Sequence, residues 1–157
     1  MVIYVNYGKK LYQLIDRYGK TNIEISNLIK ISDSLYSRYE KEEQTTIPIK
    51  HLNTLSNYFN VSIDYIFGFT NIKKYKNLRE NINIELSSQR LKSIIKENNL
   101  TQIKLADILN VDNSMLAKYE KGKYIIATTY LYQICKRYNI SADYLLGKID
   151  SPKYLNK

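Results

Sequence analysis

The sequence predicts an all-α protein made of two tandem five-helix domains, each built around a helix-turn-helix. Apolar residues recur at helical spacing through most of the 157 residues, and no segment requires a strand. The chain also repeats itself with a shift of 80 residues in the first part of each copy and 79 in the second. The aligned positions include Thr21 with Thr101, Ser34 with Ser114, residues 39–41 with 119–121, and residues 62–68 with 141–147.

The repeat sets the expected domain boundaries. We predict an N-terminal domain over residues 1–69, a basic linker over 70–86, and a C-terminal domain with a short tail over 87–157. Domains of about 65 to 70 residues are small but viable as helical bundles. The change of register falls in the polar loop after the third helix, where an insertion costs little free energy.

Each copy is divided into helices by its caps and turns. Thr21 and Thr101 are suited to cap the second helix, Ser62 and Ser141 the fifth, and Gly68 ends the first copy's fifth helix. In the first copy we expect helices over 7–18, after Thr21, over 33–41, from Pro48 to Phe59, and after Ser62. In the second we expect them over about 88–98, after Thr101, from Asp112 to Gly122, over 128–138, and over 141–146.

Residues 100–122 carry the most informative pattern. Thr101 is predicted to cap a helix whose apolar residues form one broad face: Ile103, Leu105, Ala106, Ile108 and Leu109. A tight turn over 110–112 follows, in which Asn110 tolerates a left-handed backbone. Asp112 is predicted to cap the next helix and Gly122 to end it. Two short helices joined in this way form a helix-turn-helix.

This stretch resembles the Cro and phage-repressor (XRE) family of DNA-binding domains. The resemblance rests on the Leu-Thr-Gln opening at 100–102, the Leu-Ala pair at 105–106 and the Tyr-Glu-Lys-Gly ending at 119–122. It implies the lambda-repressor-like fold, with a recognition helix that enters the major groove. One departure concerns helix one, where the family often has an Arg that pairs with the Glu of the Tyr-Glu step. Ile15 and Ile95 stand there, which leaves the partners of Glu40 and Glu120 open.

The resemblance also implies which residues contact DNA. Side chains near the start of the recognition helix reach base edges, whereas the start of helix two and the region after the recognition helix contact phosphates. The predicted base-reading residues are Asn113, Ser114, Ala117 and Lys118 in the second copy and Asp33, Ser34, Ser37 and Arg38 in the first. The predicted phosphate contacts are Gln102, Lys121, Lys123, Asn22 and Lys41.

The charge is unevenly distributed between the copies. The chain carries a net charge of +9. Residues 1–70 hold eight Lys/Arg and seven Asp/Glu, a net +1, whereas residues 89–148 hold ten and five, a net +5. Because phosphate neutralisation contributes much of the affinity for DNA, we expect the second copy to be the stronger DNA reader.

Other chemistry finds little support in the sequence. The one histidine, His51, aligns with Tyr130, and the one cysteine, Cys135, falls on the predicted buried side of its helix. No nucleophile-base set or phosphate-binding glycine loop occurs, so we expect no enzymatic activity, cofactor or metal. No apolar run approaches the roughly 20 residues of a membrane helix. We therefore expect a cytoplasmic, nucleoid-associated protein without a membrane partner.

Two hypotheses for function follow. The first is a sequence-specific regulator that binds double-stranded DNA and represses by occupying a promoter, of the bacterial, phage or mobile-element type. The second is a protein-interaction adaptor, either antitoxin-like or a phage inhibitor of host defence, whose first copy binds a protein; Asp33 and Glu42-Glu43 favour it. The fifth helices, with Tyr65, Phe67, Tyr144 and Leu145, are candidates to pack in a homodimer or an intramolecular pseudo-dimer. Both arrangements remain open.

Overall fold

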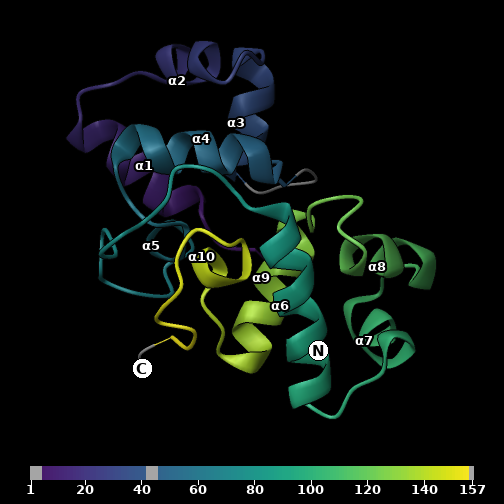
Figure 1. Ribbon diagram of the computed structural model, residues 1–157. Helices are drawn as coiled ribbons and strands as arrows, with labels where there is room; N and C mark the ends of the chain where they lie inside the picture. Colours follow the sequence, from purple (N-terminus) through teal and green to yellow (C-terminus); the bar gives the residue numbers. More distant parts are fainter. Residues whose placement is uncertain (1–4, 42–45, 156–157) are drawn as a thin grey trace. The chain divides into compact units, whose positions relative to one another are not determined.

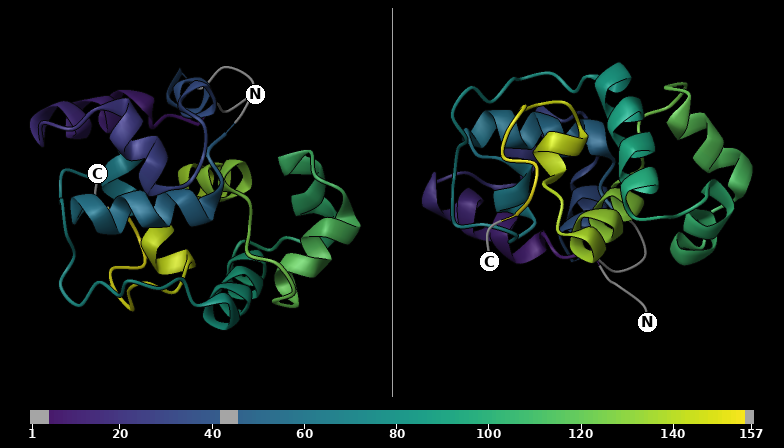
Figure 2. Two further views of the ribbon diagram at one scale, coloured as in Figure 1. Left: turned by 90° about the horizontal axis from the view of Figure 1, so that it is seen from above. Right: turned by 60° about the horizontal axis from the view of Figure 1, so that its bottom comes forward.

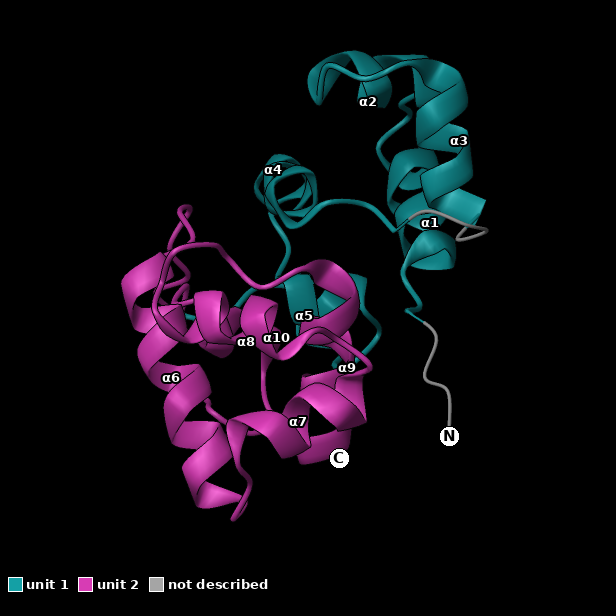
Figure 3. Cartoon of the chain, turned by 90° about the vertical axis from the view of Figure 1, so that its right-hand side faces the viewer, with its two compact units in different colours: residues 1–76, 156–157 teal, residues 77–155 magenta. Residues whose placement is uncertain are grey.

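A computed structural model describes residues 5–41 and 46–155, and these are helical as expected. The chain divides into two compact units, residues 1–76 with 156–157 and residues 77–155 (Figure 3). The described part of the chain contains ten α-helices, five in each unit, and one isolated bridge between Ile140 and Tyr154. Glu42 and Glu43 lie outside the described residues.

Unit 1 contains helices α1 to α5, shown from purple to teal in Figure 1. Their bounds are α1 Gly8–Arg17, α2 Asn22–Leu28, α3 Asp33–Lys41, α4 Ile49–Phe59 and α5 Ile63–Ile66. Within the unit, α3 packs against both α2 and α1, and α4 packs against α5. The core is formed by apolar side chains from every helix, among them Leu11, Ile25, Tyr36, Leu52 and Ile66.

In unit 2 the side chain of Cys135 is fully buried, as its helix periodicity predicted.

Unit 2 repeats the plan with helices α6 to α10. Their bounds are α6 Ile84–Glu97, α7 Gln102–Leu109, α8 Asn113–Glu120, α9 Thr128–Tyr138 and α10 Ala142–Leu145. In Figures 1 and 2 the α7–α8 pair lies on one side of α6 and α9, and α10 lies on the other. This arrangement agrees with the packing of α6 against both α8 and α10. The helix-turn-helix is therefore supported from behind by the rest of its unit.

The predicted caps explain where several helices begin. Thr21, Ser62, Thr101 and Ser141 each sit at an N-cap and accept a hydrogen bond from a backbone N–H in the first turn. Such a bond satisfies a donor that the helix itself cannot pair. Asn110 is left-handed with φ of 55°, as the turn required. Lys30 holds the equivalent turn in unit 1 with φ of 60°, although lysine adopts this region less readily.

The start of α6 differs from the prediction. We expected this helix to begin at about Ser88, but it begins at Ile84. Asn83 is its N-cap and accepts from the N–H of Leu86 at 3.0 Å. The apolar periodicity of Leu91, Ile94 and Ile95 did not extend back to this turn, so the polar cap was the only available signal.

The segment predicted as a linker is divided between the units, and each part packs within its own unit. Near its beginning, Lys73 accepts a hydrogen bond from the Ser62 N–H, and Tyr75 is buried with its hydroxyl 2.8 Å from Asp64. Near its end, the backbone N–H of Arg79 donates to the Lys148 carbonyl at 2.8 Å. The division between the units falls after Lys76, inside this segment. The expected boundaries at residues 69 and 87 remain a prediction.

A buried carboxylate begins the fifth helix in each unit. Asp64 and Asp143 occupy the same position of the repeat, and both are fully buried. Asp64 receives the Tyr75 hydroxyl, whereas Asp143 lies near the buried ammonium of Lys148. Burial lowers the Lys148 pKa, and the charge of Asp143 opposes that change. The two copies thus compensate the same buried acid with different groups.

Candidate nucleic-acid interface

The starts of both recognition helices are open to solvent. Asn113 and Ser114 at the start of α8 are exposed, as are Asp33 and Ser34 at the start of α3. One turn later, Ala117 and Lys118 are half-buried, as is Ser37, while Arg38 is exposed. The opposite face of each helix is buried through Leu116 and Tyr119 in α8 and Tyr36 and Tyr39 in α3. The first turn of each recognition helix is therefore accessible from solvent, and the opposite face of the helix packs into the core of its unit.

A side-chain hydrogen bond joins the two helices of each motif. In unit 2 the amide nitrogen of Gln102, the first residue of α7, donates to the Glu120 carboxylate at the end of α8. In unit 1 Asn22 donates to Glu40 at 3.4 Å. These bonds identify the partners of the two glutamates, which the absence of an arginine in helix one had left open. Gln102 and Asn22 each use one of their two amide N–H donors in this bond, which restricts where the second donor can point.

The burial of Glu40 affects its protonation. Its Oε2 atom is buried and has no hydrogen-bond partner among the described residues, while Oε1 accepts from Asn22. Burial raises the pKa of Glu40, and the hydrogen bond from Asn22 and the charge of Lys41 partly oppose this. The Tyr36 hydroxyl, one turn earlier, is also buried, and no described residue hydrogen-bonds to it; burial raises its pKa well above the ordinary value.

The two copies differ in charge at the start of helix two. In unit 1, Glu24 forms a capping box with Thr21, and its carboxylate accepts from the Thr21 backbone N–H at 2.7 Å. In unit 2, Lys104 stands at the equivalent position and is exposed. The N-terminus of a helix is a favourable place for a phosphate because its N–H groups and dipole attract anions. Glu24 already places an anion there, whereas Lys104 adds a positive charge.

A cluster of cations surrounds an aromatic ring after α8. The Nζ atoms of Lys118 and Lys123 lie 5.8 and 6.0 Å from the ring centroid of Tyr124, which is 48% exposed. Lys121 and Lys123 are exposed, as is Lys41 after α3. Tyr124 was absent from the predicted site, although the alternation Lys-Gly-Lys-Tyr was a visible signal. Its ring restricts the two lysines that flank it.

Two details of the predicted motif are wrong. Asp112 occupies the N-cap position of α8 but makes no capping hydrogen bond, because its carboxylate accepts from the Ser114 hydroxyl at 3.1 Å. Ile103 does not belong to the buried face of α7: it is 63% exposed, and its counterpart Ile23 is 59% exposed. On a helix, residue 103 lies about 200° from Leu105, so it points away from the face that Leu105, Ala106 and Leu109 bury.

The residues considered for other chemistry lie apart from this surface or are buried. His51 is half-buried, and burial lowers its pKa, with the neighbouring Lys50 adding to the effect. Within residues 5–41 and 46–155, no group of three or more His, Cys, Asp or Glu residues could hold a metal ion. No helix in that part of the chain has both the length and the apolar character to cross a membrane. Tyr65, Phe67 and Leu145 are buried, and Tyr144 is half-buried.

Comparison with known proteins identifies both copies. A family model described as "Helix-turn-helix domain" matches residues 8–72 and 88–151, which together make up most of the chain. The chain belongs to the helix-turn-helix domain family. The matched ranges cover the five helices of unit 1 and, in unit 2, most of α6 and the four helices that follow. They support the resemblance to Cro and phage repressors that residues 100–122 carry.

Two curated relatives from bacteria match part of the chain. The HTH-type transcriptional regulator ImmR of Bacillus subtilis is 37% identical over 65 residues, which are 41% of this chain and 51% of ImmR. Antitoxin PezA of Streptococcus pneumoniae is 30% identical over 60 residues, 38% of each chain. The matches thus span about half of ImmR and less than half of PezA. No solved structure matches the chain significantly.

Proposed function

We propose that the protein is a sequence-specific regulator of transcription that binds double-stranded DNA through two helix-turn-helix domains. The observation that carries the proposal is the pair of recognition helices whose polar first turns are exposed while their opposite faces are buried. Asn113 can bond adenine, and Lys118 and Arg38 can donate to guanine in the major groove. The name of ImmR, a transcriptional regulator, is consistent with this function. Repression follows when the bound protein occludes a promoter.

The second unit is proposed to contribute most of the affinity. Its residues 89–148 carry a net charge of +5, against +1 for residues 1–70. It also carries Lys104 where unit 1 carries Glu24, and it places Lys118, Lys121 and Lys123 near the end of its recognition helix. Phosphate contacts of this kind raise affinity for every sequence. Unit 1 would then add selectivity through Arg38, because two linked readers gain from effective concentration. A homodimer, or a pseudo-dimer within one chain, would set the symmetry of the operator.

Gln102 is proposed to act as a positioning residue. Its bond to Glu120 ties the start of α7 to the end of α8, which fixes the angle at which α8 meets the groove. The phosphate at this place would then be held by the backbone N–H groups of the first turn of α7 and by Lys104. Gln102→Ala should lower the discrimination between operator and random duplex more than it lowers binding to random duplex. A direct phosphate contact by Gln102 would lower both equally.

The experiment that tests the function is selection of bound sequences from a random duplex pool, followed by anisotropy titrations on the selected duplex. We expect a defined motif and a steep fall in affinity with salt. Lys118→Ala should relax the preference at one base pair of the motif. The matched control is Lys136→Ala, which removes an exposed lysine from α9. Failure to enrich any motif would refute sequence-specific binding.

A second function has specific support. PezA is named an antitoxin, and the near-neutral charge of residues 1–70, with Asp33 exposed at the tip of α3, is unfavourable for a phosphate surface. In this alternative unit 1 binds a protein and unit 2 binds DNA. Separate gel-shift titrations of residues 1–76 and 77–157 discriminate between the two: only the first hypothesis expects residues 1–76 to bind duplex DNA.

A further inference from the structure

The turn after the fifth helix is covered in unit 2 and open in unit 1. The two turns share their backbone, with φ of 77° at Gly68 and 76° at Gly147. A Cβ atom placed on Gly147 would lie 2.8 Å from the Asn83 Cβ, whereas one placed on Gly68 would meet no described atom within 4 Å. Among the described residues, the repeat therefore provides a filled version of the site in unit 2 and an unfilled version in unit 1.

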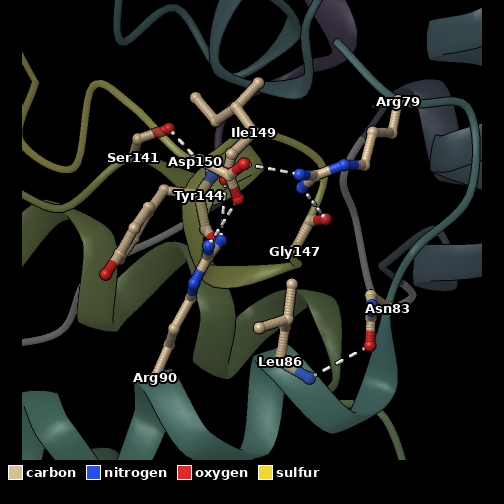
Figure 4. A network of polar contacts seen from close by, with 9 residues as sticks. All are labelled: Arg79, Asn83, Leu86, Arg90, Ser141, Tyr144, Gly147, Ile149 and Asp150. Carbon is tan, nitrogen blue, oxygen red and sulfur yellow. Dashed lines mark hydrogen bonds and ion pairs between the residues drawn. The ribbon is translucent and has the colours of Figure 1, made fainter. Parts of the chain in front are cut away.

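In unit 2 the site is filled by residues 79–83, the segment that precedes α6 (Figure 4). The Asn83 N–H donates to the Leu146 carbonyl at 3.0 Å, and the Arg79 N–H donates to the Lys148 carbonyl at 2.8 Å. The Arg79 side chain also donates to the Gly147 carbonyl at 3.1 Å. A short irregular segment thus follows the turn through its backbone and is held by one charged side chain.

A carboxylate completes the site in unit 2. Asp150 lies between Arg79 at 2.6 Å and Arg90 at 3.0 Å, and Arg90 also stacks 4.0 Å above the Tyr144 ring (Figure 4). The domain therefore supplies the acid, and the docked segment supplies a cation. Hydrogen bonds from both guanidinium groups lower the pKa of Asp150.

Unit 1 retains the cation of this site and lacks the acid. Lys10 corresponds to Arg90 and lies 4.5 Å above the ring of Tyr65, as Arg90 does above Tyr144. Asn71 stands where Asp150 would be. Among the described residues, neither Lys9 nor Lys10 forms an ion pair. A cavity of about 240 Å³ opens here, lined by Asn6, Lys9, Lys10, Gln13, Phe67 and Gly68.

We propose that this groove of unit 1, beside Gly68 and Lys10, binds a short acidic peptide segment of a partner protein. The filled site of unit 2 shows that the turn accepts a peptide segment of about five residues in length. The charge is complementary to an acid because Lys9 and Lys10 line the groove and none of its described lining residues is acidic. The carboxylate that Asp150 provides in unit 2 would come from the partner. This surface is separate from the recognition helices, so it adds a protein contact to a DNA-binding chain.

The test uses the full-length, isotope-labelled protein and two acetylated, amidated pentapeptides in an NMR titration. One peptide has the sequence of residues 79–83, and the other differs only in having glutamate at the Arg79 position. We expect the acidic peptide to shift the amide signals of Lys10, Gln13 and Gly68 and to bind at least about ten-fold more tightly than its parent. Lys10→Gln should remove that difference, and Lys92→Gln, which removes an exposed lysine from α6, should leave it unchanged.

Several results would overturn the proposal. Equal affinity for the two peptides, or no shifts up to their solubility limit, would show that the groove does not select an acidic segment. Shifts centred on α2 and α3 would show that the peptide binds as a general anion at the DNA surface. If a variant lacking residues 1–4 shifted the Lys10 and Gly68 signals without peptide, the chain's own first residues would be the occupant. DNA affinity measured on the same samples keeps this test separate from that of the regulatory function.

Discussion

The charge at the start of helix two should determine how strongly each domain binds DNA. Glu24 and Lys104 occupy equivalent positions three residues into the helix-two region, and they differ by two charge units. Each phosphate that a protein neutralises contributes a slope of about 0.9 in the dependence of log K on log salt. At about 0.15 M salt, each such contact therefore contributes roughly a five-fold gain in affinity relative to the 1 M standard state, where this contribution vanishes.

Three variants of the full chain test this reasoning. Lys104→Glu should lower the affinity for random duplex by at least about five-fold and reduce the salt slope by about one. Glu24→Lys should have the opposite effect. Glu24→Gln isolates the charge, because glutamine retains the capping-box acceptor for the Thr21 N–H while removing the anion from the helix N-terminus. Its effect on affinity should have the same sign as that of Glu24→Lys and be smaller.

The assay is fluorescence anisotropy with a labelled random duplex, repeated over a range of salt concentrations, with urea unfolding of each variant to confirm that it is folded. A Lys104→Glu variant with an unchanged salt slope would refute a phosphate at the start of α7. An unchanged affinity for both Glu24 variants, with a clear effect of Lys104→Glu, would show that unit 1 makes no phosphate contact through helix two. That result would favour the protein-binding alternative for unit 1.

Three further predictions concern single residues. Lys118→Ala should relax the preference at one base pair, at a cost of about 1–3 kcal/mol in binding free energy, while Lys123→Ala should weaken binding to all sequences alike. Competition titrations against single-base operator variants measure this. Uniformly weaker binding by Lys118→Ala to every operator variant would contradict the prediction. Tyr36→Phe removes a buried hydroxyl that has no partner in residues 5–41 and 46–155, at a position where the second copy has Leu116. It should therefore raise the free energy of unfolding by about 1 kcal/mol in urea titrations, and a loss of stability would reveal a partner for the hydroxyl. Burial raises the pKa of Glu40 in the folded state, so protonation of Glu40 stabilises the fold below the ordinary carboxyl pKa, and this stabilisation is lost as pH rises through the raised pKa. Glu40→Gln should therefore remove part of the fall in the free energy of unfolding over that pH range. An identical pH profile for the variant would exclude a contribution from Glu40.

The helices could be predicted because their signals are local. Caps such as Thr101 and Ser141, the left-handed Asn110 and the apolar periodicity of α9 each depend on residues within one or two turns. The repeat reinforced every one of these signals, since a pattern that occurs twice is seldom accidental. Where the apolar pattern stopped short, at residues 84–87 of α6, the prediction stopped as well.

The contacts of the site could not be predicted in the same way. The bond of Gln102 to Glu120 joins residues 18 positions apart, and the same spacing in unit 1 joins Asn22 to Glu40. Polar residues at these positions suit phosphate contact and interhelical bonding equally well, so only the packing of the two helices distinguishes them. The roles of residues 79–83 were hidden for a similar reason. These residues are basic and polar and lack apolar periodicity, so they have the composition of a linker. Their hydrogen-bond partners lie about 65 to 70 positions away in the sequence.

The differences between the copies point in one direction. At two places unit 1 carries an acid where unit 2 carries a cation or a neutral residue: Glu24 against Lys104, and Asp33 against Asn113. At a third, the described residues leave Gly68 uncovered whereas Gly147 is covered. Differences confined to the fold would scatter between core and surface, yet the boundaries of the second to fifth helices agree within one residue between the units, and the first helix alone begins earlier in unit 2. These three differences lie at the surfaces that we propose to meet partners. Two domains with one fold and different surfaces are better suited to different partners, or to unequal shares of one operator, than to two identical half-sites.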